Sequence, residues 1–397
     1  MYGRELCLVL IAASAAACGV ESHRDATAVD IVADEAIAID VRDGADDSVD
    51  ALDVRVDSQS DRPYLPIAAF PPIAEPVDNP GTEARVALGL QLFHDPVLSS
   101  DHSVACVTCH GEIWGLSDGL PRSIGVGGFG PPGPGRYGPT HTLRNASTLW
   151  NAAYRAGLFW DGRATSLEEQ VAFPMRSAIE MARDPELVAD DLRAYPAYVS
   201  LFAAAFPDEP QPITAANLAR AIAAFERTLV SNHAPFDHWV QGHALAMSDD
   251  EVRGWTVFNA VGCASCHVAP LFESERYEPS FATVVNDAPD EGRFDATGSE
   301  SDRGLFRVPT LRNLRFTGPY FHNGAVTDLP AAIALEVRHR ATRAIDAGEL
   351  AALVSFLQVS VVDITRSPDR PRVAPSGLAV PTDTLEIPRW RTDAGQD

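Results

Sequence analysis

Apolar residues recur at helical spacing in four stretches of the chain, whereas the alternating pattern of strands is sparse. Two of these stretches begin with a capping signal: Thr82 precedes the first, and Ser248 with Glu251 forms a capping box before the third. The apolar faces consist of Val86, Gly89, Leu92 and Phe93; Leu218, Ile222, Phe225 and Leu229; Val252, Trp255 and Phe258; and, within 347–357, Leu350, Leu353, Val354 and Leu357. The pattern predicts a mainly α fold.

The first 62 residues do not share this pattern. Arg4, a short apolar stretch and a run of small residues are typical of a secretory signal peptide over 1–18, and the apolar stretch is too short to span a bilayer. A buried N-terminal helix is the alternative, and Cys18 resembles the lipid-bearing cysteine of bacterial lipoproteins. Residues 19–62 predict a disordered acidic linker, since they hold thirteen Asp and Glu against four Arg and no aromatic residue.

Length, composition and charge exclude several classes of function. A chain of 397 residues suggests two globular domains, and 46% hydrophobic with 22% charged residues is ordinary for a folded protein. The formal net charge of −24 disfavours nucleic acid as a partner, because phosphate binding requires concentrated Lys and Arg. The sequence contains no lysine, so the chemistry of Schiff-base and P-loop lysines is excluded.

Two C-x-x-C-H motifs stand at Cys106, Cys109 and His110 and at Cys263, Cys266 and His267. This is the attachment sequence of c-type haem, in which two thiols bind the porphyrin and the His reaches the iron. A structural zinc site would need the two C-x-x-C pairs close together, a thioredoxin-like pair would need no His, and a disulfide would explain neither copy. Two such motifs in an exported chain predict two covalently bound haem c groups.

The similar surroundings of the two motifs suggest an internal duplication. We therefore expect two cytochrome c-like haem domains in tandem, with long irregular loops. The expected boundaries are 63–240 for the N-terminal domain and 241–365 for the C-terminal domain, followed by a C-terminal tail over 366–397.

Further motifs surround the two C-x-x-C-H sites. In chain order they are Leu88-Gly89, Leu92-Phe93, Asp95-Pro96, Arg144-Asn145-Ala146, Phe159-Trp160-Asp161-Gly162-Arg163-Ala164, Glu180-Met181 and Pro319-Tyr320-Phe321-His322-Asn323-Gly324-Ala325. With these motifs, residues 65–360 resemble the bacterial di-haem cytochrome c peroxidases, a family that includes the methylamine-utilisation enzyme that matures a tryptophan-derived quinone. The resemblance implies a peroxidatic N-terminal haem and an electron-transfer C-terminal haem.

The resemblance also implies catalytic roles for three residues. Glu180 matches the distal carboxylate that moves a proton between the peroxide oxygens, which is chemistry that a carboxylate beside open iron can perform. Gln170 resembles a residue that lines the same pocket. Trp160 resembles the tryptophan that lies between the haems and couples them, although an aromatic residue in such a place is usually ordinary core.

A calcium site and a residue near the haems follow from the same resemblance. Asn145, with the backbone carbonyls of Thr317 and Pro319, matches the site where the family holds Ca²⁺ at the domain interface. Oxygen ligands of mixed type suit that hard cation. His322 resembles a residue that lies close to the haems.

The chain departs from the family's peroxidases at one loop. Those enzymes carry a loop His that ligates the N-terminal haem at rest and leaves before peroxide binds, and here Val126 stands at that position. Valine cannot bind iron. We therefore expect an open distal position at this haem without reductive activation, unless His141 takes the role of the loop His.

The second departure concerns the sixth ligand of the C-terminal haem. The family's peroxidases use Met at the position of Glu336, and no Met follows Met247 in this chain. Because Met ligation raises a haem potential, its replacement should lower this one. Glu336, His339 or water could fill the site, and the alternative is that both side chains face solvent. In the quinone-maturing enzyme the matching residue is Tyr.

These features imply a periplasmic di-haem peroxidase that reduces hydrogen peroxide to water with electrons from a small cytochrome c or copper protein. The two departures favour an alternative, a di-haem enzyme that uses peroxide to oxidise aromatic side chains of a partner protein. A non-enzymatic di-haem electron-transfer cytochrome is the third hypothesis. A membrane would be reached only through a lipid anchor at Cys18, and homodimers are common in the family.

Overall fold

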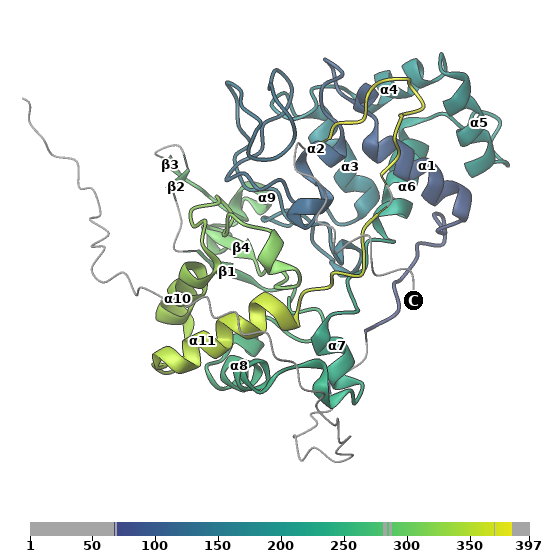
Figure 1. Cartoon of the computed structure of the whole chain (residues 1–397). Helices are drawn as coiled ribbons and strands as arrows, with labels where there is room; N and C mark the ends of the chain where they lie inside the picture. The colour runs from purple at the N-terminus through teal and green to yellow at the C-terminus, as the bar shows by residue number, and fades with distance from the viewer. Residues whose placement is uncertain (1–66, 68–69, 281–283, 286–287, 369, 383–397) are drawn as a thin grey trace, which may run out of the picture. The chain divides into compact units, whose positions relative to one another are not determined.

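The computed structural model describes residue 67 and residues 70–280, 284–285, 288–368 and 370–382. The predicted signal peptide and the predicted acidic linker lie outside these residues. Helices dominate the described part, as the sequence pattern predicts (Figure 1). None of these helices combines the length and the apolar character that crossing a bilayer requires.

The α-helices before residue 230 are α1 (Glu83–His94), α2 (Cys106–Cys109), α3 (Leu167–Arg176), α4 (Pro185–Leu192), α5 (Pro196–Ala205) and α6 (Ala215–Glu226). Thr82 caps α1 as predicted, because its side-chain oxygen accepts the Arg85 N–H over 3.3 Å. The cap satisfies a backbone donor that the first turn would otherwise leave unpaired.

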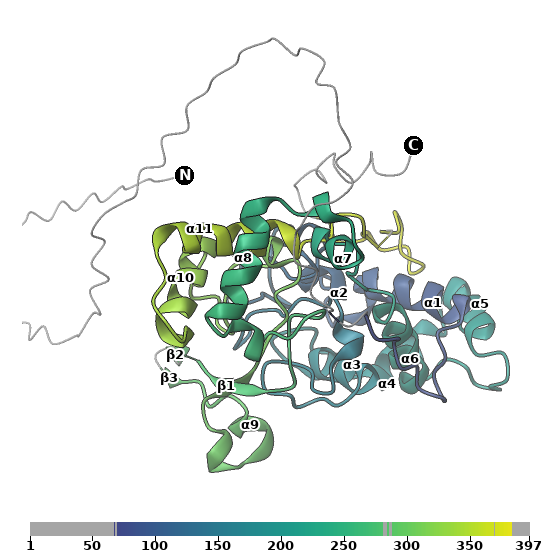
Figure 2. The same ribbon diagram turned by 90° about the horizontal axis from the view of Figure 1, so that it is seen from below.

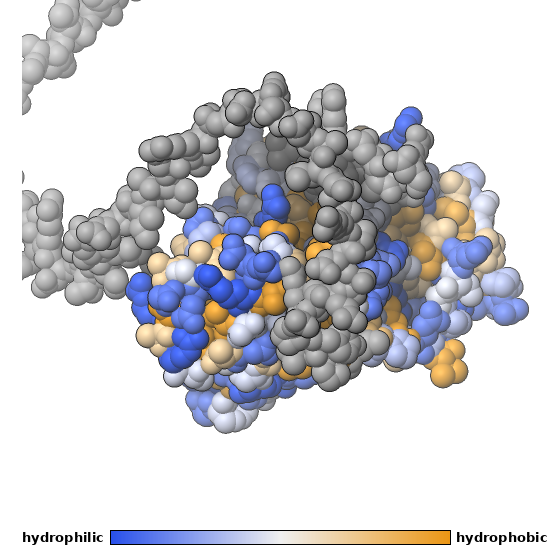
Figure 3. Space-filling model, turned by 60° about the horizontal axis from the view of Figure 1, so that its bottom comes forward, coloured by the Kyte–Doolittle hydropathy of each residue, from blue (hydrophilic) through white to orange (hydrophobic). Residues whose placement is uncertain are grey.

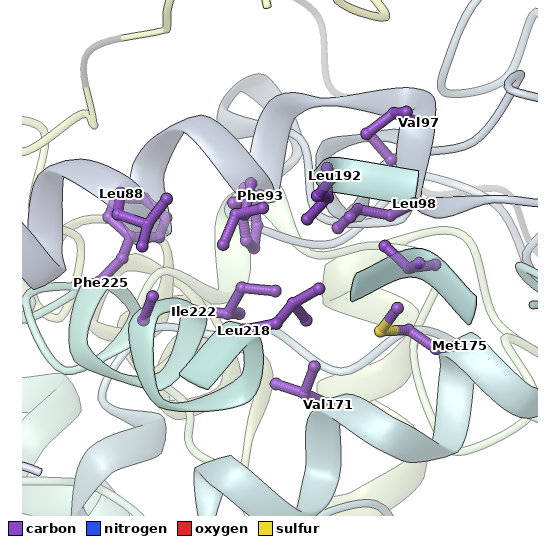
Figure 4. Packing of buried hydrophobic residues seen from close by; sticks show 14 of the residues in the cluster. Leu88, Phe93, Val97, Leu98, Val171, Met175, Leu192, Leu218, Ile222 and Phe225 are labelled. Atoms are coloured by element: carbon purple, nitrogen blue, oxygen red, sulfur yellow. The ribbon is translucent and has the colours of Figure 1, made fainter. Parts of the chain in front are cut away.

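Close approach of α1 and α6 builds the first core. A Cβ on Gly89 would lie 1.9 Å from the carbonyl oxygen of Ala221, so only glycine fits at this crossing. Leu88 and Phe93 of α1 then meet Phe225 of α6 in the apolar cluster of Figure 4, where the ring centroids of the two phenylalanines lie 5.2 Å apart.

The α-helices of the second half are α7 (Pro235–Val240), α8 (Asp249–Ala260), α9 (Phe294–Thr297), α10 (Leu329–Arg340) and α11 (Ala347–Ser355). The capping box predicted before α8 is confirmed: Ser248 N donates to Glu251 Oε2 over 3.0 Å, and Glu251 N donates to Ser248 Oγ over 3.3 Å. α8 packs on α11 at another glycine, since a Cβ on Gly254 would lie 2.1 Å from the Ala352 carbonyl oxygen.

Strands are short, as the sparse alternation predicts. β1 (Tyr277–Pro279) pairs antiparallel with β4 (Leu305–Arg307), and β2 (Val284–Val285) pairs antiparallel with β3 (Ala288–Pro289). Short 3₁₀ helices cover Pro96–Leu98, Glu112–Trp114, Ala152–Tyr154, Ala244–Ala246, Cys263–Ser265, Glu300–Asp302 and Leu314–Phe316. Long irregular segments connect these elements.

Two predicted helices end differently from their apolar pattern. α6 ends at Glu226, because Thr228 N bonds to Phe225 O and Leu229 N bonds to Glu226 O in tighter turns. Leu229 therefore lies beyond the helix, although its side chain stays buried. α11 ends at Ser355 and the chain continues as a π-helix over Phe356–Ser360.

The buried apolar side chains form two large clusters among the described residues. The first runs from Leu88 to Leu229 and the second from Phe236 to Val361, so the change falls in a short stretch of chain. α1, α4, α5 and α6 lie at one end of the molecule and α8, α10 and α11 at the other (Figure 2). Hydrophilic and hydrophobic residues are interspersed over the face shown in Figure 3.

Candidate haem sites

The first C-x-x-C-H motif forms α2, and His110 follows it directly. The His110 Nδ1 lies 3.0 Å from the carbonyl oxygen of Leu116. A carbonyl at this distance holds the ring proton on Nδ1 and leaves Nε2 as the nitrogen that can bind iron. Burial lowers the pKa of His110, which keeps the ring neutral, as a metal ligand must be.

The second motif has the same arrangement. His267 Nδ1 lies 3.0 Å from the Pro309 carbonyl oxygen and 3.2 Å from that of Phe272, and burial lowers the pKa of His267 to about 4. Sequence reasoning missed these backbone acceptors, because a carbonyl carries no signature of residue type. Both histidines are therefore oriented for ligation through Nε2.

The four motif cysteines are free thiols. Burial raises the pKa of Cys106 to about 12 and that of Cys263 to about 11, and it raises the pKa of Cys109 as well. A zinc site needs thiolates, and among the described residues no three His, Cys, Asp or Glu side chains converge as a metal site requires. The two C-x-x-C pairs thus do not form a joint zinc site in the described part of the chain.

A cavity of about 450 Å³ lies beside the second motif. Its volume falls within the range of cofactor pockets, roughly 300–1,000 Å³. Cys263, Cys266 and His267 line its wall together with one face of α10. That face consists of Leu329, Ala332, Ile333, Glu336, Val337 and Arg340. A largely apolar wall that includes two thiols and an oriented imidazole fits a haem.

The structure separates the two candidate sixth ligands. Glu336 lies in the middle of the cavity-facing side of α10, whereas His339 is exposed and is not part of the described cavity wall. Burial raises the pKa of Glu336, and this effect is partly offset by Arg340, whose Nε lies 4.0 Å from Glu336 Oε2. A carboxyl group therefore faces the cavity that fits the second haem.

The loop after the first motif packs against the turn that carries Glu180. Val126 N donates to the Glu180 carbonyl oxygen over 2.8 Å. A Cβ on Gly125 would lie 2.3 Å from the carbonyl oxygens of both Ile179 and Glu180, so this contact requires glycine. Val126 packs against the first apolar cluster, and His141 is exposed. The Val126 loop and the turn that carries Glu180 thus contact each other through backbone atoms.

The Arg136 side chain holds this loop by hydrogen bonds to its backbone carbonyls. Its Nε donates to the Ile124 carbonyl over 2.7 Å, and its Nη2 donates to the Gly125 carbonyl over 2.8 Å. Asp101 Oδ2 accepts the Gly127 N–H over 2.8 Å. Arg136 is buried, so its hydrogen bonds are shielded from water. No sequence motif pointed to Arg136 or Asp101.

Glu180 lies half-buried near the first motif. After burial itself, the charges of Asp118 and Glu180 raise the pKa of the Cys109 thiol, which shows that both carboxyl groups lie near it. Burial raises the pKa of Glu180, and a hydrogen bond from Ser177 partly offsets that rise. Gln170 lies half-buried on α3, and within the described residues no hydrogen bond joins its side chain to Glu180.

Trp160 lines the cavity beside the second C-x-x-C-H motif. Its indole N–H donates to the Asn145 carbonyl over 2.9 Å, and its ring centroid is 6.3 Å from that of His322. The segment that begins at Asn145 also reaches the first site, because His110 faces the backbone of Ser147. Trp160 is thus hydrogen-bonded to the segment that also contacts His110.

The three residues of the predicted calcium site line this same cavity. Asn145 is buried, and its Nδ2 donates to the Leu120 carbonyl over 2.8 Å. Thr317 and Pro319 approach from the second half of the chain. An amide oxygen with two backbone carbonyls is an oxygen-only donor set, which fits Ca²⁺ in its chemistry.

Arg144 ties the two halves together next to Trp160. Its Nη1 lies 2.6 Å from Asp161 Oδ2, and its Nη2 lies 2.5 Å from Asp290 Oδ1 and 3.0 Å from Asp295 Oδ2. Arg144 and Asp290 are buried, so the network is shielded from solvent screening. Because Asp161 directly follows Trp160, this network holds the indole in place.

The fold and the two sites define a di-haem protein, and comparison with known proteins identifies its family. The model of the family described as di-haem cytochrome c peroxidase matches residues 83–245. Cytochrome c551 peroxidase of Pseudomonas aeruginosa is 35% identical over 330 residues, which cover 81% of this chain and 90% of that protein. The methylamine utilization protein MauG of Methylorubrum extorquens is 40% identical over 262 residues, which cover 66% of this chain and 70% of that protein.

A solved structure agrees with these relatives. The crystal structure of a MauG-like protein associated with microbial copper homeostasis superposes with a TM-score of 0.65 at 29% identity, covering 74% of this chain and 93% of that one. The chain therefore belongs to the di-haem cytochrome c peroxidase family. It is a haem-dependent oxidoreductase that acts on peroxide.

Proposed function

We propose that this protein is a periplasmic di-haem peroxidase that reduces hydrogen peroxide to water with electrons from a small cytochrome c or a cupredoxin. The cysteines of the two motifs would hold haem c covalently, with His110 and His267 as iron ligands. When bound, the haems supply redox-active iron and, at the first site, an open position for peroxide. The N-terminal domain (63–240) would be peroxidatic, and the C-terminal domain (241–365) would receive electrons.

The observation that carries this proposal is the contact between Glu180 and the Val126 loop beside the first motif. Glu180 offers a carboxyl group whose pKa is raised by burial. Val126 offers no atom that could close an iron position opposite His110. Arg136 holds this loop in place by three hydrogen bonds to its carbonyls.

Glu180 would move the proton. Its carboxylate would take a proton from one peroxide oxygen and return it to the other, which would leave as water when the O–O bond breaks. Two electrons and two protons complete the reduction of one H₂O₂ to two waters. Burial raises the pKa of Glu180 above its ordinary value of 4.5, which suits a group that must both accept and return a proton. Gln170 would line the same pocket.

Trp160 would conduct electrons between the two sites. The hydrogen bond to the Asn145 carbonyl holds the indole N–H, and the Arg144 network fixes the neighbouring Asp161. An aromatic π system between redox centres suits this role. Glu336 would be the sixth ligand or nearest neighbour of the second iron, a role for which it is better placed than His339.

Several partners belong to the proposal. Export would follow from the signal peptide over 1–18, with lipidation of Cys18 as the alternative route to a membrane. Ca²⁺ would be held by Asn145, Thr317 and Pro319 at the junction of the halves. The homodimer belongs to the proposal only through the resemblance to the family. The electron donor would approach the second site.

A second function is favoured by Glu336 at the family's Met position and by the similarity to methylamine utilization protein MauG. In that function, peroxide would serve to oxidise aromatic side chains of a partner protein. One experiment separates the two. Holoprotein is mixed with H₂O₂ and a reduced small cytochrome c or cupredoxin, and donor oxidation is followed optically. Catalytic donor oxidation supports the peroxidase, whereas a modified Trp or Tyr in a co-purified partner, found by mass spectrometry without donor turnover, supports the second function.

A further inference from the structure

After Val361, the last residue of the second apolar cluster, the chain packs again on the N-terminal half. Residues 370–382, here named the C-terminal strap, lie beside the helices of the first half (Figure 1). Leu378 packs against the first apolar cluster, and Ala374 and Val380 are buried. The strap is therefore part of the packing around the first haem site.

One anchor of the strap is a buried carboxylate in the first half. Ser376 donates its N–H to Asp95 Oδ2 over 3.1 Å and its hydroxyl to Asp95 Oδ1 over 2.8 Å. The Tyr198 hydroxyl also donates to Asp95 Oδ2, over 2.7 Å. Asp95 is fully buried, so these hydrogen bonds satisfy a charge that has no access to water.

The other anchor is the ion pair between Arg370 and Glu112. Arg370 Nε donates to Glu112 Oε1 over 3.3 Å, and Arg370 Nη2 contacts Glu112 Oε2. His94 Nε2 lies 3.4 Å from Glu112 Oε1. Glu112 is buried, so its ion pair with Arg370 is shielded from solvent screening.

Glu112 belongs to the loop that orients the first haem ligand. It lies two residues after His110, and its carbonyl accepts the Gly115 N–H over 3.2 Å. The loop closes where Gly111 N donates to the Ser117 carbonyl over 2.8 Å. Leu116, next to this closure, supplies the carbonyl that lies 3.0 Å from His110 Nδ1. Glu112 therefore belongs to the same short loop as the Leu116 carbonyl, which accepts the hydrogen bond from His110 Nδ1.

We propose that Arg370 is a positioning residue for His110. Through Glu112 it holds loop 111–117 so that the Leu116 carbonyl stays hydrogen-bonded to His110 Nδ1. This hydrogen bond raises the basicity of the ligating nitrogen, and therefore strengthens the bond from His110 to iron. The inference rests on the proposed role of His110 as iron ligand. It makes the C-terminal strap, which follows the second haem domain, a determinant of the first haem's properties.

The test is Arg370→Gln in the haem-loaded protein. The iron–histidine stretching band of the reduced first site is measured by resonance Raman spectroscopy, and both midpoint potentials by spectroelectrochemistry. We expect the band to shift to lower frequency and the first potential to rise, because a weaker Nδ1 hydrogen bond makes His110 a weaker donor. The second potential should not change. Arg372→Gln is the matched control, since Arg372 is an exposed arginine of the same strap.

An Arg370→Gln protein with full haem content, whose band and potentials equal those of Arg372→Gln, overturns the inference. If Arg370→Gln does not take up haem, Arg370→Lys replaces it, because lysine keeps the charge and loses the two-pronged contact. That variant should show a smaller shift in the same direction, and an unchanged band overturns the inference equally. These measurements use no peroxide, so failure of the proposed peroxidase function would be seen separately, as absent turnover in the unmodified protein.

Discussion

Val126 donates its backbone N–H to the carbonyl oxygen of Glu180 over 2.8 Å. The hydrogen bond joins the residue that stands at the position of the family's loop His to the residue that we propose moves the peroxide proton. Gly125 allows this contact and Arg136 fixes it. In the proposed function, the first site would combine a proton-transfer group with a loop that carries no ligand for iron.

Restoring a histidine at this loop should close the site. In Val126→His, the imidazole is expected to bind the first iron at rest and to make it six-coordinate and low-spin, as observed by EPR. Reaction of the oxidised protein with peroxide should slow about tenfold if the ligand occupies the iron nine-tenths of the time. Val126→Leu is the control and should react like the unmodified protein. A high-spin first haem in Val126→His would show that the loop does not face the iron.

Removing the proton-transfer group should impair the reaction with peroxide. Glu180→Gln is expected to slow this step by about 10²–10⁴-fold, the usual contribution of a positioned acid–base group. Since the carboxylate must first accept a proton, the rate in the unmodified protein should fall as pH drops through the pKa of Glu180, which burial places above 4.5. Stopped-flow pH profiles test both points. Glu186→Gln, at an exposed position, should leave rate and profile unchanged.

The buried Glu226 should make stability depend on pH. Its Oε2 has no hydrogen-bond partner among the described residues, and burial raises its pKa from 4.5 to about 8. The folded state thus holds this proton more tightly than the unfolded state, so the group's stabilising contribution is complete below pH 4.5 and is lost as pH rises through about 8.

Glu226→Gln should therefore raise the free energy of unfolding at pH 9 by on the order of a few kcal/mol and change it little at pH 4. Denaturant unfolding of the haem-loaded protein at the two pH values measures the difference. Glu186→Gln, at an exposed position, should show no such dependence. Equal effects of Glu226→Gln at both pH values would mean that this carboxyl group ionises normally inside the protein.

Glu336 should determine the potential of the second haem. Glu336→Met restores the residue type of the family's peroxidases and is expected to raise that potential, because thioether ligation favours reduced iron. His339→Ala should leave it unchanged, since His339 is exposed and lies outside the described cavity wall. Spectroelectrochemistry of the two variants decides between the candidate ligands. A shift with His339→Ala and none with Glu336→Met would assign the site to His339.

Local features of the fold were predictable from the sequence because their causes lie within a few residues. Thr82 caps α1, and Ser248 with Glu251 caps α8, through hydrogen bonds that span three residues. The two C-x-x-C-H motifs are local for the same reason. The end of α6 before Leu229 was not predictable, since the tighter turns there are backbone hydrogen bonds with no apolar signature.

The contacts that position the site residues were not predictable, because they join residues far apart in the sequence or use backbone atoms. Arg370 contacts Glu112 across 258 residues of sequence, and neither residue belongs to a motif. The carbonyls of Leu116 and Pro309 orient His110 and His267, but any residue type could supply them. Sequence similarity pointed to Glu180 and Trp160. Their environment, which raises one pKa and fixes one indole N–H, follows only from the packing.

The most direct test of the central claim is to mix the fully oxidised, haem-loaded protein with hydrogen peroxide in a stopped-flow spectrometer, without prior reduction, and then to add a reduced cytochrome c or cupredoxin. With Val126 in place of a loop His and Glu180 proposed as the proton-transfer group, we expect an immediate change in the haem spectrum, followed by the oxidation of two one-electron donors for each peroxide consumed. A protein that is inert to peroxide until one haem has been reduced would contradict it.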